Sequence, residues 1–385
     1  MITNNENIFQ LNNEHRRCMG LQLCKRNYDI VYINDEVEGR KRIFKLYFDR
    51  NKLVKLDDIW ISNECIYFVE KDVECDTINN RSIVLSRKNN AKNKKLNLSF
   101  LNSLNGKGNY FGIFSYFNNL RSSYAIIGNY TTQKTFFEER YLNLKSFDDI
   151  AKWCDNYVKN SLNDDIKKAQ LFSKENVKHI KYSENDYFRV KFDRHNYLYG
   201  RILFDINKQE KLNNFKYFGG LMGHNLIIEI FHILTSKKNM SVDELKELKT
   251  FPPQVIMDNK FYYGDCEIIG NCKIDKRPAY PIVYGALSKD EIVFQCGEIR
   301  KSIPYNEKDF IGDKNKYYDG GSGFDIIIDN KNVIEKCIKS NSNEPYWDFY
   351  GDQYDIRAPK NRKDLINVLK LYNHSELENV YNNND

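Results

Sequence analysis

Apolar and polar residues alternate along the first third of the chain in a pattern that predicts a series of short strands. The run Arg42–Phe48 alternates with a period of two, which is the repeat of a strand with two different faces. Such runs recur roughly every 10–12 residues, and turn residues such as Asp49–Asn51 separate them. They predict an antiparallel sheet or meander. The other runs are residues 28–34, 53–61, 66–73, 82–85, 110–117 and 124–130.

Three segments of the first half carry helical signals instead. Asn12 or Asn13 can cap a short helix that Gly20 ends. Ser146 precedes Asp149 at the spacing of a helix cap. A further helix is predicted over residues 163–175, so a helix pair follows the strands. The first helix of this pair has an apolar stripe at helical spacing, formed by Ile150, Trp153, Cys154, Tyr157 and Val158.

The second half opens with a clear β-hairpin, formed by Tyr187–Asp193 and Tyr197–Ile206. Gly200 in the middle of the return strand indicates either a β-bulge or the close approach of another backbone. The run Leu226–Leu234 is almost wholly apolar, which is typical of a buried central strand. Further short strands are predicted at residues 255–257, 266–269, 292–295 and 324–328, and helices at residues 241–248, 332–339 and 363–372.

These elements predict an α+β fold that is mainly antiparallel β with a few peripheral helices. A chain of 385 residues is longer than one hydrophobic core usually serves, so two domains are expected. The change from strands to helices places the boundary near residue 178. We therefore expect an N-terminal β-rich domain over residues 1–178 that ends in the helix pair. A second β-rich domain with C-terminal helices is expected over residues 179–385.

Composition favours a folded cytoplasmic protein. The 27 Tyr and 24 Phe provide large surfaces to bury, which argues against disorder. Nine cysteines without a Cys-x-x-Cys pair predict reduced thiols rather than zinc ligands. The first residues lack a basic and apolar leader, and no apolar run approaches the ~20 residues of a membrane helix. The predicted localisation is therefore cytoplasmic, with no membrane partner.

The chain contains no recognisable catalytic constellation. No P-loop, dinucleotide-binding fingerprint or Gly-x-Ser-x-Gly elbow is present. His224 and His232 lack the His-Glu-x-x-His spacing of a zinc helix. We therefore predict a non-enzymatic protein with no catalytic residue, no metal and no cofactor. An enzyme with an unfamiliar site around His224 and Glu229 stays open as an alternative.

The net charge of +6, from 59 Lys and Arg against 53 Asp and Glu, is a weak bias but an uneven one. Residues 81–107 carry seven basic residues and no acid. This tract is either a phosphate-binding arm or a solvated loop between two strands. One face of the hairpin is basic as well. It is either a surface that binds phosphate or a carboxylate partner, or simply a solvated face of the sheet. The candidate phosphate or nucleic-acid contacts are Arg87, Lys88, Lys94, Lys95, Arg189 and Arg201.

Residues 344–355 form an acidic and aromatic run that contains no Lys or Arg. Aromatic anchors surrounded by carboxylates suit the docking of a basic protein. The alternative is a strand and turn that packs its aromatic rings inward. The candidate partner-binding residues are Trp347, Asp348, Tyr350, Asp352 and Asp355.

The return strand of the hairpin contains the motif Tyr199–Asp205. With four other segments of the second half, it resembles the immunity protein 26 family of bacterial polymorphic-toxin systems. The family core has a strand with a Tyr-Gly-Arg-Ile-like element, which is similar to Tyr199–Asp205 here. The likeness covers roughly residues 180–300, and residues 81–175 look similar to the N-terminal region of longer members. The other segments that carry the likeness are Tyr187–Phe192, Pro252–Ile256, Tyr263–Gly270 and Pro281–Gly285.

The resemblance implies a mainly β, non-enzymatic protein that is encoded beside a toxin and neutralises it by direct binding. It transfers no catalytic residue, and the glycines Gly200, Gly264 and Gly270 are as readily structural as functional. The targets of such proteins are often nucleases. Inhibitors of nucleases are often acidic, however, whereas this chain is net basic.

We therefore predict an immunity-type protein that occludes a cognate toxin, with a nuclease as one target class. The alternative is a nucleic-acid-binding or phage-related accessory protein that uses the basic tract at residues 81–107. Neither the toxin nor the oligomeric state follows from the sequence.

Overall fold

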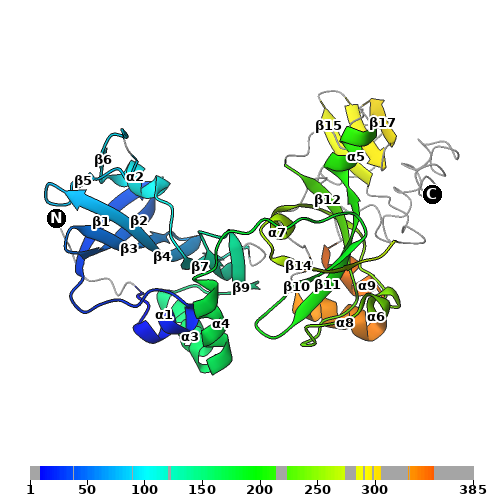
Figure 1. Ribbon diagram of the computed structural model, residues 1–385, viewed down its shortest axis with the longest axis horizontal. Coiled ribbons are helices and arrows are strands. Elements are labelled where there is room, and N and C mark those ends of the chain that lie inside the picture. Colours follow the sequence, from blue (N-terminus) through cyan, green and yellow to red (C-terminus); the bar gives the residue numbers. More distant parts are fainter. Residues whose placement is uncertain are drawn as a thin grey trace. The chain divides into compact units, whose positions relative to one another are not determined.

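The computed structural model divides the chain into two compact units, Met1–Lys178 and His179–Asp385. We call them unit 1 and unit 2 and describe each by itself (Figure 1). For the three strands between residues 283 and 304, the description is limited to the backbone. The structure describes residues 9–37, 39–88, 90–119, 123–213, 223–273, 283–288, 291–296, 299–304, 328 and 330–350.

Unit 1 is built on a nine-stranded antiparallel sheet of described residues. Its main path runs in the order β1-β2-β3-β4-β7-β8-β9, and β5 and β6 continue from β4 as a short side ribbon. Nearly every strand pairs with its neighbour in sequence, as the alternating runs predict. The strands are β1 (Asp29–Val37), β2 (Arg40–Asp49), β3 (Lys52–Ile61), β4 (Cys65–Ile78), β5 (Ile83–Val84), β6 (Lys94–Lys95), β7 (Asn109–Tyr116), β8 (Tyr124–Asn129) and β9 (Lys134–Arg140).

The two faces of this sheet bury two apolar clusters. On β2, Ile43 belongs to one cluster, whereas Phe44 and Leu46 belong to the other. This division follows from the period of two. Helices α1 (Asn13–Met19), α3 (Phe147–Lys159) and α4 (Asn163–Phe172) cover the first cluster (Figure 1). Helix α2 (Leu98–Ser103) contributes Leu101 to the second cluster.

The helix signals of unit 1 are confirmed at the expected residues. The Asn12 side chain accepts hydrogen bonds from the first turn of α1, and Gly20 ends the helix in the left-handed conformation. The Ser146 side chain accepts from the Asp149 amide at the start of α3. Within the predicted stripe, Ile150, Cys154 and Tyr157 are buried, and the ring of Trp153 stacks on Phe111 with centroids 5.7 Å apart.

Unit 2 is built on a five-stranded antiparallel sheet in the order β13-β12-β11-β10-β14. Its largest cluster contains residues of α7, α8 and α9, and a second cluster involves α6. The strands are β10 (Asp186–Lys191), β11 (Tyr197–Asp205), β12 (Asn225–Ile230), β13 (Gln254–Met257) and β14 (Cys266–Asn271). The helices are α5 (Ile206–Asn213), α6 (Val242–Lys246), α7 (Asn259–Tyr262), α8 (Lys331–Ser340) and α9 (Glu344–Tyr350). A three-stranded sheet adds β15 (Val283–Ser288), β16 (Glu291–Cys296) and β17 (Ile299–Pro304).

Gly200 marks a close approach of two backbones. A Cβ atom at this position would lie 2.5 Å from the Glu229 carbonyl oxygen and 2.5 Å from the Phe188 ring. The register between β11 and β12 shifts instead between Ile202 and Phe204. Of the two interpretations of this glycine, close approach is therefore the one that holds.

The α+β class with mainly antiparallel sheets is confirmed. The structure also adds elements that the sequence patterns did not predict, namely β6, α2, β9, α5, α7, β15 and β17. Glu344–Tyr350 is a helix rather than a strand, because Pro345 is tolerated in the first turn of a helix. The strand predicted over residues 324–328 and the helix over residues 363–372 lie outside the described residues, apart from Ile328.

All eight cysteines whose side chains the structure describes are free thiols. None of the described helices is both long enough and apolar enough to cross a membrane.

Candidate functional site

The basic face of the hairpin in unit 2 is tied into the fold by ion pairs. Arg201 on β11 lies opposite Glu229 on β12, and its Nε atom donates to the Glu229 carboxylate. The Glu229 side chain is fully buried, and burial raises the pKa of this carboxyl although Arg201 acts to lower it. The Arg201 guanidinium also lies near the rings of Tyr187 and Phe231. Arg201 is therefore held inside the fold rather than presented as a free cation.

Arg189 has a similar set of contacts. Its guanidinium donates to the Glu267 carboxylate on β14, to the Lys238 carbonyl at 2.7 Å and to the Asn239 side chain at 2.9 Å. These bonds join the sheet to the segment that precedes α6. The structure thus places two of the predicted phosphate contacts, Arg189 and Arg201, in internal contacts of unit 2.

In the described part of unit 2, His224 and His232 have separate polar partners. The His224 ring nitrogen lies 2.8 Å from Asp205, and the hydrogen bond to this carboxylate raises the pKa of His224. His232 instead contacts Asn343 at 2.6 Å, and burial lowers its pKa. Among the described residues, no group of three or more His, Cys, Asp or Glu side chains is arranged to hold a metal ion.

The acidic and aromatic run begins as α9, which packs against α8 and the largest cluster of unit 2. Tyr346 is buried with its ring 5.9 Å from Phe251, and Trp347 is partly buried against the same cluster. Asp348 on this helix is exposed. The inward packing of aromatic rings is thus present at Tyr346 and in part at Trp347. The Tyr350 side chain, Asp352 and Asp355 lie outside the described part of the chain.

The basic tract of unit 1 divides into paired and exposed cations. Arg81 contacts Asp29 at 2.6 Å, and Lys107 and Arg87 contact Glu74 at 2.7 and 3.4 Å. Hydrogen bonds from Lys107 and Lys52 lower the pKa of Glu74 to about 2. The remaining lysines of the tract are exposed to solvent, and they are Lys88, Lys92, Lys94 and Lys95.

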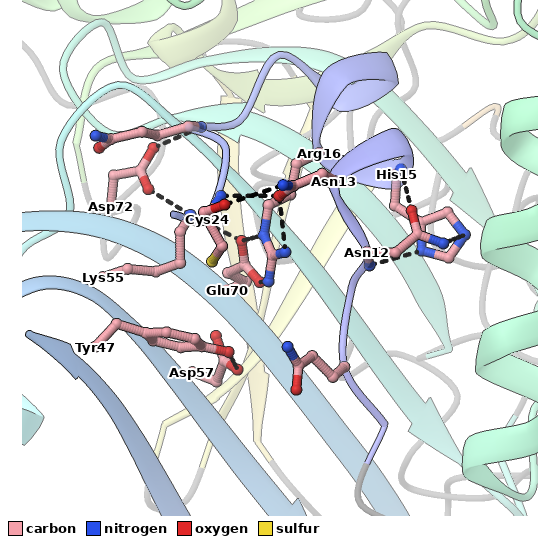
Figure 2. A network of polar contacts seen from close by, with 12 residues as sticks. Asn12, Asn13, His15, Arg16, Cys24, Tyr47, Lys55, Asp57, Glu70 and Asp72 are labelled. Atoms are coloured by element: carbon pink, nitrogen blue, oxygen red, sulfur yellow. Dashed lines mark hydrogen bonds and ion pairs between the residues drawn. The ribbon is translucent and has the colours of Figure 1, made fainter. Parts of the chain in front are cut away.

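A buried network of charges lies under α1 in unit 1 (Figure 2). Arg16 donates two hydrogen bonds of 2.8 Å to the two oxygens of Glu70. Lys55 donates to Glu70 at 2.8 Å and to Asp72 at 2.6 Å. Burial opposes the charge of Glu70, but Lys55 and Arg16 outweigh it and lower the pKa of this carboxyl. The network therefore fixes α1 to the sheet by matched charges, in addition to the apolar contacts of Cys18 and Met19.

Asp57 lies beside this network and has a different environment. It accepts a hydrogen bond of 2.7 Å from the Tyr47 hydroxyl, and its other oxygen is buried with no hydrogen-bond partner in the structure. Complete burial, together with the charge of Glu70 opposite it on β4, raises the pKa of Asp57 to about 7. Asp57 is thus an internal carboxyl that titrates near neutral pH.

Sequence reasoning missed this network, although the strands contain a signal for it. Lys55 and Asp57 take alternate positions on β3, and their cross-strand partners Asp72 and Glu70 do the same on β4. All four lie on a strand face that elsewhere buries apolar residues such as Ile59. A lysine at a core position of one strand, opposite a carboxylate on the neighbouring strand, predicts a buried ion pair.

A cavity of about 690 Å³ opens beside the network, between the loop after α1, strands β3 and β4, and α4. Its wall contains five basic residues and three carboxylates. Lys25 contacts Asp49 at 2.9 Å, and Lys52 contacts Glu74 at 2.6 Å. These contacts neutralise part of the wall and leave it with an excess of two positive charges.

Comparison with known proteins gives one result. Residues 184–286 match the family model of immunity protein 26. The match begins just before β10 and ends within β15, so it lies in unit 2. It confirms the resemblance of the C-terminal half to this family. No curated protein and no solved structure gives a significant match to the chain.

Proposed function

We propose that the protein is an immunity protein that binds a cognate bacterial toxin and neutralises it in the cytoplasm. The observation that carries this proposal is the match of residues 184–286 to immunity protein 26. Inhibition is by occlusion and needs no chemistry, because a bound protein can exclude substrate from the site of the toxin. A nuclease is one target class, since nucleic-acid-cleaving proteins present basic surfaces.

The acidic face of α9 is the proposed contact in unit 2. Asp348 is exposed on this helix, and its neighbour Trp347 is partly buried. The segment Glu344–Tyr350 contains two carboxylates and no basic residue. Its charge is complementary to a basic partner, and such complementarity speeds association and selects the partner. Tyr350, Asp352 and Asp355 are further contacts proposed from the sequence alone, and they fall outside the described side chains.

Co-expression with the toxin encoded by the adjacent gene tests the proposal. Wild-type protein should restore growth to cells that express this toxin, and it should co-purify with it. Asp348→Lys should weaken toxin binding by about tenfold, because it places a cation against a basic partner. The matched control is Glu247→Lys, which reverses another exposed charge in unit 2.

The outcomes separate the function from the surface. If wild-type protein neither protects cells nor binds the toxin, the immunity function is wrong. If wild-type protein protects and Asp348→Lys protects equally well, only the assignment of α9 is wrong.

Nucleic-acid binding is the second candidate function, and the exposed lysines at the β5–β6 ribbon favour it. Lys88, Lys94 and Lys95 are exposed, so they are available to phosphates. Binding of duplex DNA or RNA should then weaken steeply as salt is raised, and Lys94→Glu with Lys95→Glu should abolish it. Absence of a mobility shift at low salt would exclude this function.

A further inference from the structure

One end of the unit 1 sheet is a long strand whose outer side is exposed. Strand β1 (Asp29–Val37) is the terminal strand of the sheet and pairs with β2 along all nine of its residues. No other described strand pairs with it. Its outer backbone groups thus form a ready template for one more strand, which natural proteins usually protect by a short, charged or covered edge.

The exposed side chains of β1 are apolar at its centre. Ile30, Val31 and Tyr32 are 43%, 38% and 49% exposed. Val31 lies next to Leu46 and extends one face of the sheet, whereas Tyr32 lies next to Lys45 and extends the other. An added strand would therefore continue both layers of the sheet and cover apolar surface on both faces.

The opposite end of the same sheet is built differently. On the terminal strand β9, Phe136 and Phe137 are buried, and their rings meet Phe172 of α4 and Trp153 of α3. Lys134 pairs with Glu175 at 3.0 Å beyond α4. Helices thus cover β9, whereas none of the described helices buries the apolar centre of β1. The exposure of β1 is a specific property of this edge.

Charge identifies the occupant that suits this edge. Strand β1 carries three carboxylates, Asp29, Asp35 and Glu36, and no Lys or Arg. Pairing β1 with a second copy would bring six carboxylates onto two adjacent strands without a basic residue on either. Like charges on paired strands are unfavourable, whereas a strand with Lys or Arg side chains would meet opposite charges.

We propose that β1 is a docking strand that takes an extended, basic segment of the toxin as an additional strand of the unit 1 sheet. This inference rests on the proposed immunity function and names a contact in unit 1, outside the matched residues 184–286. Main-chain hydrogen bonds provide affinity in this mode, and pockets for alternate side chains provide selectivity. Val31 and Tyr32 cover the apolar side chains of the docked segment. Asp35 and Glu36 select its basic ones, because Asp29 already pairs with Arg81.

A pair of double variants tests the docking strand in the full-length protein. Val31→Lys with Tyr32→Lys removes exposed apolar surface from β1 and adds repulsion toward a basic segment. The control, Leu23→Lys with Leu171→Lys, makes the same change of charge at two other exposed apolar residues of unit 1. Both double variants change only exposed side chains, so both should melt within a few degrees of the wild type.

Titration calorimetry with the toxin of the adjacent gene gives the first measurement. The β1 variant should bind this toxin at least about tenfold more weakly than the wild type, and the control should bind like the wild type. Hydrogen exchange gives the second measurement. Toxin should slow exchange of the amides of β1 and leave those of β9 unchanged.

Each outcome has a distinct meaning. If wild-type protein binds the toxin and the β1 variant binds equally well, the docking strand is wrong and the immunity function stands. If wild-type protein does not bind the toxin, both proposals fall. If the wild type forms a dimer that Val31→Lys with Tyr32→Lys dissociates, the occupant of β1 is a second copy and the proposal is overturned.

Discussion

At the scale of single residues, the charges of unit 1 are unusual because several of them lie inside the fold. Arg16, Lys55 and Glu70 have side chains that are at most 2% exposed. Their mutual contacts repay the cost of removing them from water, and removing one partner from such a set costs about 3–5 kcal/mol. Asp57 lacks an equivalent cationic contact and therefore holds its proton more tightly than an exposed aspartate.

The raised pKa of Asp57 predicts a pH dependence of stability. The folded state binds this proton more tightly than the unfolded state, so ionisation disfavours the folded state. Stability from this group should fall as pH rises from about 4 to about 7. Asp57→Asn should remove this loss, and each pKa unit corresponds to about 1.4 kcal/mol. The measurement is urea unfolding of both proteins near pH 5 and near pH 8.

The difference between the two proteins isolates this residue from the other titrating groups. The pKa of His224 is raised and that of His232 is lowered, so both histidines change the stability with pH. Their contribution is the same in the variant and in the wild type. A stability difference that stays constant between these two pH values would contradict the raised pKa of Asp57.

At the scale of elements, local signals predicted those helices and strands whose stabilising contacts lie between residues that are close along the chain. The caps of α1, α3 and α6 lie within four residues of the groups they satisfy, so the sequence contains the whole interaction. Strand β9 was not predicted, because its adjacent residues Phe136 and Phe137 are both buried. Two neighbouring apolar residues interrupt the alternation of apolar and polar positions that marks a strand. Helix α2 is only six residues long and lies inside the basic tract.

The cap of α3 leads to a prediction at this scale. Ser146 accepts a hydrogen bond from the Asp149 amide at 3.1 Å and donates one to its carboxylate at 2.9 Å. Ser146→Ala should therefore lower the free energy of unfolding by about 1 kcal/mol. The control is Ser103→Ala, which removes only an exposed bond to the Phe100 carbonyl and should stay within about 0.5 kcal/mol. Equal losses in both variants, measured by urea unfolding, would contradict the capping role.

At the scale of the whole molecule, the chain consists of two compact units that have separate sheets and separate apolar clusters. The family match lies in unit 2, whereas the exposed edge strand lies in unit 1. The net charge of +6 hides an uneven distribution of charged residues in both units. Exposed lysines gather near the β5–β6 ribbon, and carboxylates gather on β1 and α9.

The separate clusters predict two unfolding transitions in calorimetry. Ser146→Ala should lower the midpoint of one transition, and Glu229→Leu should lower the midpoint of the other. The second variant leaves Arg201 without its buried partner, which costs about 3 kcal/mol or more. A single transition that both variants shift would show that the two units unfold as one.

The sequence by itself determined the fold class, most of the described strands and the capped helices α1, α3 and α6, because alternation and capping act between residues that are close along the chain. It also led to the family, through motifs within residues 184–286. Only the tertiary structure decided which charges are internal. Arg16 and Glu70 are 54 residues apart, and Arg201 and Glu229 are 28 apart, so no local pattern pairs them. Likewise, only the assembled sheet shows that β1 and β9 are terminal strands of its main path, and only the packing of α3 and α4 shows that β9 is covered. Both are properties of residues that lie far apart along the chain.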